Sequence, residues 1–305
     1  MDKVLRIGTR ESQLAVWQAS HVQQMLVRKG FQSELVFIKS DGDIDLITPL
    51  YEIGVQGIFT KTLDAALLNN KIDIAVHSMK DVPTQLAKGI AQAAVLKRGN
   101  YKDILVYNNG QLTIDNSHLT IATSSIRRKS QWLHKYPQHQ ICNLRGNVNT
   151  RLKKLTESNW DAAIFAAAGL ERINLRPQDS IELDWMLPAP AQGAIMMVCR
   201  ENDQETKEKC LLLNDEASAL CTKIERDFLR TLFGGCSTPI SALAEIENQE
   251  LIFRGNIFSS DGKEKMETEK IVSMDNAATI GVDAAKELLK NGADKIVENI
   301  RNAGK

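Results

Sequence analysis

The chain has 305 residues, of which 43% are hydrophobic and 25% are charged. This composition is typical of a folded protein with two or three domains, and it excludes a disordered chain or a very small domain held together by disulfides. Lysine and arginine number 38, as do aspartate and glutamate, so no overall charge attracts nucleic acid or anionic lipid.

Apolar periodicity predicts the same order of elements twice. The first set is a strand at 4–8, a helix at 12–29, a strand at 34–39, a helix at 59–70 and a strand at 72–78. After an irregular passage come a strand at 119–123, a helix at 125–136, a strand at 140–144, a helix at 147–157 and a strand at 161–167. Strands that alternate with helices form parallel sheets with right-handed crossovers, so we expect two α/β lobes.

The rest of the chain predicts a third, smaller domain. A strand at 194–200 lies beyond the second lobe, and we expect it to cross back to the first. A helix at 215–233 is followed by strands at 242–247, 250–258 and 264–273 and by helices at 277–290 and 293–302, which indicates an α+β domain. The expected domains are therefore 1–97 with 195–214 (lobe 1), 98–194 (lobe 2) and 215–305 (the C-terminal domain).

The loops after the parallel strands carry the candidate binding residues, because ligands of such sheets bind beyond the carboxyl ends of the strands. These loops are 9–12, 40–43, 77–83, 123–128, 145–147 and 168–172. Most of them combine arginine or lysine with glycine or small hydroxyl residues. Helix N-termini and guanidinium groups both favour anions. We therefore expect the two lobes to surround a ligand with several negative charges.

Positive charge is concentrated in one segment of this neutral protein. Residues 116–156 contain no aspartate or glutamate, but they contain eight cations. We interpret Lys129, Lys135, Lys153 and Lys154 as a solvated surface. The arginines at the junctions between loops and helices are the candidate anion ligands: Arg127, Arg128 and Arg145. A nucleic-acid-binding module is an alternative, although no recognised motif accompanies the cluster.

Two single residues could carry chemistry. Asp81 is an acid in a loop otherwise suited to anions, where it could protonate a leaving group or stabilise a cation; a helix cap or an ion pair with Lys80 explains it equally well. Cys236 follows two glycines and could be a nucleophile or a covalent anchor, or else an inert thiol. His77 has no second histidine or cysteine at ligand spacing, so we interpret it as structural and expect no metal.

The remaining signals concern compartment and cofactor class. The five cysteines are an odd number without a C-x-x-C pair, which indicates neither a disulfide framework nor a zinc site. The amino terminus shows no basic and then apolar leader, and no apolar stretch approaches the roughly 18 residues of a membrane span, so we expect a cytoplasmic protein. Neither a G-x-G-x-x-G nor a GK[ST] loop is present, so nucleotide cofactors are not expected.

Seven motifs, in order, closely resemble the hydroxymethylbilane synthase family, also called porphobilinogen deaminase. They are GTRESQLAVWQA, DIAVHSMKDVPT, ATSSIRRKSQW, LRGNVNTRLKKL, AAAGLERI, PAPAQGA and GGCSTPI. The resemblance spans about residues 5–240 and continues more weakly to the carboxyl terminus. It implies two lobes similar to those of periplasmic binding proteins, followed by a small C-terminal domain.

The resemblance also implies an activity. Such enzymes join four porphobilinogen molecules head to tail, lose ammonia each time and release the linear tetrapyrrole hydroxymethylbilane to water. A dipyrromethane, attached by a thioether, serves as the primer. Each pyrrole carries an acetate and a propionate, which matches the expected polyanion. The expected protein is thus a monomeric transferase of haem biosynthesis.

Family roles follow for individual positions. Cys236 resembles the cysteine that bears the cofactor, and Asp81 resembles the catalytic aspartate. Phe59 falls at the position of an aromatic residue near the active site. Positions that hold cofactor and substrate carboxylates correspond to Arg10, Ser12, Ser78, Lys80, Ser124, Ser125, Arg127, Arg128, Arg145, Arg151 and Arg172.

The sequence departs from the family motifs at two positions, and a second class of protein is an alternative. Gln56 stands where many members have lysine, so a cationic contact to the cofactor is expected to be missing or replaced. Ala191 replaces a glycine of the PxxGQGA motif, and we expect a small local backbone change. A two-lobed binding protein for anionic solutes would also have paired lobes and an anion site, but the absent leader and Cys236 disfavour it.

Overall fold

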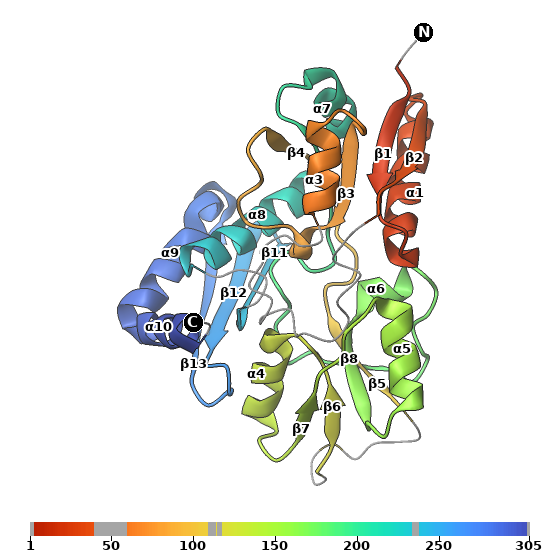
Figure 1. The fold of residues 1–305 in the computed structure, drawn as a ribbon. Helices are drawn as coiled ribbons and strands as arrows, with labels where there is room; N and C mark the ends of the chain where they lie inside the picture. Colours follow the sequence, from red (N-terminus) through yellow and green to blue (C-terminus); the bar gives the residue numbers. More distant parts are fainter. Residues whose placement is uncertain (1–2, 40–59, 109–113, 115–117, 234–237, 304–305) are drawn as a thin grey trace. The chain divides into compact units, whose positions relative to one another are not determined.

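The computed structural model describes residues 3–39, 60–108, 114, 118–233 and 238–303. The described residues form two compact units. The first unit comprises the residues up to 99 together with 193–220, and the second comprises 100–192 together with 221–303. Figure 1 shows the elements of both.

The first unit contains a five-stranded sheet in the order β2-β1-β3-β10-β4. Its strands are β1 (Leu5–Thr9), β2 (Ser33–Phe37), β3 (Ile74–Ser78), β4 (Ile90–Val95) and β10 (Ile195–Arg200). β1 pairs in parallel with both β2 and β3, whereas β10 runs antiparallel to β3 and to β4. The return of β10 to the first sheet is confirmed, and because it enters from the opposite end the sheet is mixed rather than purely parallel.

Among the described residues, this sheet is accompanied by the helices α1 (Gln13–Arg28), α3 (Lys61–Leu68) and α7 (Gln204–Leu211) and by the short 3₁₀ turn η2 (Met79–Asp81). α1 begins where the Ser12 side chain accepts the amide of Ala15, and it ends before Gly30, whose φ is +87°. Ala19, Val22 and Leu26 recur at helical spacing and pack in one core with strand residues of β1 and β3. This apolar stripe fixes α1 on the sheet.

The second unit repeats the arrangement in a sheet with the order β7-β6-β8-β5-β9. Its strands are β5 (Asp103–Tyr107), β6 (Thr120–Ala122), β7 (Gln140–Cys142), β8 (Ala162–Ala166) and β9 (Ile181–Glu182). β6 pairs in parallel with β7 and β8, and β5 runs antiparallel to β8. The predicted β-α-β-α-β order and the α/β fold class are confirmed.

Helices cover both faces of this second sheet: α4 (Ile126–Lys135), α5 (Val148–Glu157) and α6 (Ala167–Glu171). Ile104 and Val106 of β5 belong to one core with Leu155 and Leu170, which lie on α5 and α6. Leu105 belongs to another core, with Trp132 of α4. Successive strand residues point to opposite faces, so both faces are apolar and buried.

A three-stranded antiparallel sheet also belongs to the second unit (Figure 1). It contains β11 (Ile240–Glu247), β12 (Glu250–Phe258) and β13 (Lys265–Ser273), and it is accompanied by α8 (Glu216–Thr231), η3 (Met274–Thr279), α9 (Ile280–Leu288), η4 (Leu289–Ala293) and α10 (Asp294–Ala303). Phe228 of α8 contacts Phe253 with ring centroids 5.2 Å apart. A Cβ on Gly255 would lie 2.6 Å from the Phe228 ring, so glycine permits this close packing. The small α+β part is confirmed.

The passage between the two predicted lobes is not irregular. It contains β4 and β5, which the sequence analysis missed, as it missed α7 and the two-residue strand β9. Within the described residues, no helix combines the length and apolar character needed to cross a membrane.

Candidate functional site

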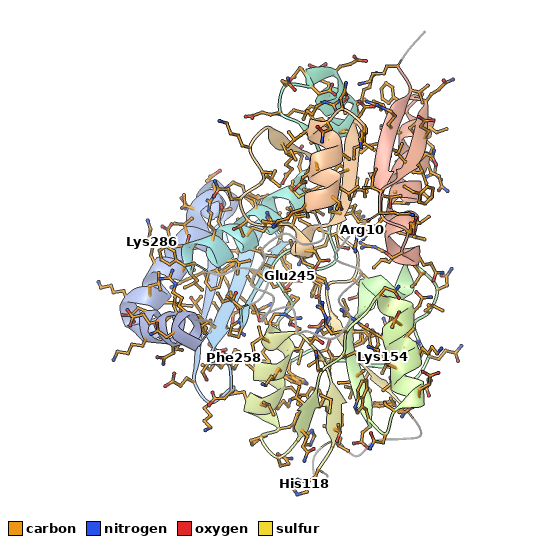
Figure 2. All side chains as sticks on the ribbon, viewed as in Figure 1. Arg10, His118, Lys154, Glu245, Phe258 and Lys286 are labelled. Carbon is orange, nitrogen blue, oxygen red and sulfur yellow. The ribbon has the colours of Figure 1, made fainter. Side chains whose placement is uncertain are left out.

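The first unit brings five predicted site residues to one edge of its sheet. β1 and β3 run parallel, so the loops that follow them start at the same edge. Arg10 follows β1 and Ser12 begins α1, whereas Ser78 ends β3 and continues into η2 with Lys80 and Asp81. Figure 2 labels Arg10 at the end of β1.

The hydroxyl groups at this edge hold the helix against the strands. Ser12 Oγ accepts the amide of Ala15 at 3.4 Å, which caps α1. Ser78 Oγ accepts Gln18 Nε2 at 2.8 Å, and Gln18 is a buried residue of α1. The two loops are therefore fixed relative to each other before any ligand binds.

Asp81 makes no hydrogen bond or ion pair with another residue of the described part of the chain. The sequence allowed a helix cap or an ion pair with Lys80 as a structural role, and neither contact is formed. Its side chain is half-buried. A carboxylate that pairs with no other side chain of the described segments is available to a ligand.

His77 precedes this loop and is buried on β3. Burial, and secondly the charge of Arg10, lower the pKa of His77 to about 4. The imidazole is therefore neutral at pH 7, and its buried Nε2 has no hydrogen-bond partner. Among the described residues, no cluster of three or more His, Cys, Asp or Glu side chains is placed to hold a metal ion.

The second unit gathers its predicted residues at the corresponding edge. β6, β7 and β8 are parallel; Ser124 and Ser125 follow β6, and Arg145 follows β7, whereas Arg172 lies at the carboxyl-terminal end of α6, the short helix that follows β8. Ser125 Oγ accepts the amide of Arg128 at 3.4 Å and caps α4. Ser124 Oγ accepts the amide of Leu144 at 2.8 Å, which joins the loops after β6 and β7.

Arg127 and Arg128 are buried and share a counter-ion that the sequence analysis did not find. Nη2 of each lies 2.7 Å from the carboxylate of Asp103, whose side chain is fully buried. Asp103 begins β5 and pairs with Ala166 at the end of β8, so the cluster lies at the edge of the candidate site. One carboxylate faces two guanidinium groups, which leaves a net positive charge at this edge.

The other predicted arginine ligands of the second unit, Arg145, Arg151 and Arg172, are buried or half-buried. Arg145 is buried, and Arg151 Nε donates to the carbonyl of Gly146 at 2.7 Å. Burial lowers the pKa of Arg172 to about 10, although Glu171 opposes the shift. A partly desolvated guanidinium binds a carboxylate more strongly than an exposed one does. Of the four lysines interpreted as a solvated surface, Lys135 and Lys153 are exposed, whereas Lys129 and Lys154 are half-buried.

Two predicted site residues lie outside the described part of the chain: Phe59 and Cys236. Gln56 lies outside it as well. A cavity of about 840 Å³ in the second unit is lined by none of the predicted site residues. Charged side chains in its wall pair with each other, as Arg254 does with Glu245 and Glu269.

Fold and site together define a class: an α/β protein of two units, each with cations and hydroxyl groups at the carboxyl ends of parallel strands, suited to an anionic ligand. Two family models match the chain, the porphobilinogen deaminase dipyrromethane cofactor binding domain at residues 5–208 and the porphobilinogen deaminase C-terminal domain at 219–290. The chain belongs to the porphobilinogen deaminase family.

Curated relatives agree with this assignment. Porphobilinogen deaminase of Chlorobium phaeobacteroides (strain BS1) is 40% identical over 310 residues, which cover 99% of both chains. Porphobilinogen deaminase of Chloroherpeton thalassium is 39% identical over 311 residues, again 99% of both. Among solved structures, the methionine binding protein MetQ covers 68% of this chain and 89% of its own at 15% identity, with a TM-score of 0.45.

The expected family, the transferase class in tetrapyrrole biosynthesis and the dipyrromethane cofactor are thereby confirmed. The family match sets aside the alternative of a solute-binding protein.

Proposed function

We propose that Asp81 is the catalytic residue with which this chain joins four porphobilinogen molecules head to tail. The observation that carries the proposal is that its carboxylate has no partner in the described residues, at an edge that otherwise presents Arg10, Ser12, Ser78 and Lys80. Cations at this edge suit the substrate's acetate and propionate, whereas a single carboxylate suits its amine, its pyrrole N–H or a developing cation.

The proposed chemistry conserves atoms and charge. The bond between the aminomethyl carbon and nitrogen of porphobilinogen breaks, and the electron pair leaves on nitrogen as ammonia. The methylene-pyrrolenine cation that remains would be stabilised by the Asp81 carboxylate, which also accepts the pyrrole N–H. The α-carbon of the growing chain forms the new bond and loses one proton, which balances the proton carried away by the amine.

The carboxylate-binding role is proposed for the arginines and serines of both units. The described side chains fit a cofactor with several carboxylates, because the buried arginines are desolvated and one guanidinium charge of the Arg127 and Arg128 pair is not neutralised by Asp103. Arg127 Nε is also buried without a hydrogen-bond partner. An acetate or propionate would supply the missing acceptor.

We propose Cys236 as the attachment point and Phe59 as an aromatic wall of the site, on the family motifs alone. When bound through a thioether, the dipyrromethane supplies the pyrrole α-carbon to which the first porphobilinogen is joined. The three-domain division at 97/98, 194/195 and 214/215, a monomeric state, cytoplasmic location and no binding of nucleic acid belong to the same proposal.

Intact-protein mass before and after incubation with porphobilinogen tests the proposal directly. The purified protein should exceed the polypeptide mass by one dipyrromethane, and substrate should add further pyrrole units. The Cys236→Ser variant should have the bare mass. An unmodified mass in the parent protein, produced in a host that makes the cofactor, would contradict the tether.

A further inference from the structure

Glu225 is a buried carboxylate that the proposed function does not use. It lies on α8 in the second unit and is fully shielded from solvent. Its two oxygens accept different backbone amides, Ala191 N at 2.6 Å and Ala244 N at 2.8 Å. One side chain thus joins α8 to β11 and to the turn before Gly193.

That turn leads to the arginine pair. Gln192 follows Ala191, is fully buried, and donates Nε2 to Asp103 Oδ1 at 2.9 Å and to the carbonyl of Tyr101 at 2.8 Å. Asp103 in turn holds Arg127 and Arg128. A continuous path of short hydrogen bonds therefore runs from Glu225 to both guanidinium groups.

A second contact joins the same turn to the pair. Arg127 Nη1 donates to the carbonyl of Leu187 at 2.8 Å, and the amide of Leu187 donates to Gln131 Oε1 at 2.9 Å. The segment 187–192 thus contacts Arg127 directly through the Leu187 carbonyl, and it contacts Asp103, the counter-ion of both arginines, through Gln192. A displacement of this segment would move both arginines together.

We propose that Glu225 is a positioning residue that fixes Arg127 and Arg128 relative to α8. This inference rests on the role proposed above for the two arginines. Glu225 contacts no substrate in this assignment; it acts through Gln192 and Asp103.

The Glu225→Gln variant of the full-length holoenzyme tests the inference. The amide keeps one acceptor and turns an NH₂ group toward a backbone N–H, so one bond is replaced by repulsion between donors. Intact-protein mass should show that the cofactor remains attached. In assays run well below the unfolding temperature of the variant, the KM for porphobilinogen should rise on the order of tenfold. Gln192→Met removes the hydrogen bond from Gln192 to Asp103 and should raise KM by a similar factor. This second variant tests the inference if Glu225→Gln does not fold.

Ile224→Ala provides the matched control on the same helix. Ile224 is buried beside Gly281, so its loss should lower the unfolding temperature through packing alone. Its KM should stay within about twofold of the parent. If Glu225→Gln and Gln192→Met lower only the unfolding temperature and leave KM unchanged, as the control does, the inference is wrong.

The Arg127→Leu and Arg128→Leu variants distinguish failure of the positioning role of Glu225 from failure of the carboxylate-binding role of the two arginines. If Arg127→Leu and Arg128→Leu raise KM while Glu225→Gln and Gln192→Met do not, the positioning role alone fails. If none of the four changes KM, the carboxylate-binding role of the pair fails with it.

Discussion

At the scale of single residues, the candidate site contrasts one acid with many cations. Asp81 makes no hydrogen bond or ion pair within the described residues, whereas Asp103 is fully buried against two arginines. The first is available to a ligand, and the second serves as a counter-ion. Two aspartates thus have different roles because their surroundings differ.

Replacement of Asp81 by Asn tests the catalytic role. The amide is similar in size but carries no charge to stabilise the cation, so kcat should fall on the order of 100-fold or more. Intact mass should still show the cofactor, and the unfolding temperature should change little because no internal contact is lost. Turnover near that of the parent would end the assignment.

Ala191 shows a conflict between residue and backbone. Its φ of +62° lies in the left-handed region that favours glycine, where the family motif often has glycine. The small backbone change expected at this position stays a prediction; the left-handed φ itself is strained for alanine and has a cost. Ala191→Gly should therefore stabilise the protein by up to about 1 kcal/mol, reduced by the added freedom of glycine in the unfolded chain.

The check on Ala191→Gly is the urea midpoint of unfolding together with the KM for porphobilinogen. The midpoint should rise and KM should stay unchanged, because the Ala191 amide still donates to Glu225. A lower midpoint would mean that packing of the buried methyl group outweighs the relief of strain.

At the scale of elements, periodicity predicted most helices, the parallel strands and the antiparallel strands β10 to β13, but it missed β4, β5, β9 and α7. The apolar run in β5 faces buried cores on both sides, so its residues show no alternation that would indicate a strand. Its partner, β8, follows about 60 residues later, and local sequence does not specify such a pairing. The return of β10 was predicted; its neighbour β4 was not.

Missing β5 also meant missing Asp103. The edge of the site could be predicted from the loops after parallel strands, but the direction of each guanidinium could not, since it depends on a carboxylate from a distant strand. One signal was available: residues 116–156 contain eight cations and no acid, so any buried member requires a counter-charge from elsewhere.

The arginine pair gives a prediction for α4 and β5 together. Arg127→Leu removes a charge and a donor to Leu187 while Arg128 still pairs with Asp103. The KM for porphobilinogen should rise, or intact mass should show intermediates that accumulate during chain growth. The expected size is about tenfold, typical of the loss of one charged hydrogen bond. Unchanged kinetics with an intact cofactor would restrict Arg127 to a structural role.

At the scale of the whole molecule, each unit has a buried aspartate that binds several cations, but at different edges. In the second unit Asp103 lies at the edge of the candidate site. In the first unit Asp73 precedes β3, at the edge opposite Asp81, and binds Lys3, Arg6 and Arg200. Substitutions in the Asp73 cluster therefore do not touch Asp81, the proposed catalytic residue.

Acid stability follows from the Asp73 cluster. Burial alone would raise the pKa of Asp73, but hydrogen bonds from Arg6, Lys3 and Arg200 outweigh it and hold the pKa well below the usual range. A carboxyl with a depressed pKa stabilises the fold above its unfolded pKa of about 3.9, and the contribution is lost as pH falls through the folded value. The protein should thus lose this stabilisation progressively below about pH 4.

The comparison of parent and Asp73→Asn measures that contribution. At pH 7 the variant should unfold at a markedly lower urea concentration, because three cations lose their shared carboxylate. Between about pH 4 and 3 the parent's midpoint should begin to fall toward that of the variant, because the unfolded chain then binds a proton at Asp73 that the folded protein does not bind. Activity per folded, cofactor-loaded molecule at pH 7 should be unchanged, because the cluster lies at the opposite sheet edge from Asp81. A difference between the two midpoints that stays constant down to pH 3 would contradict the depressed pKa.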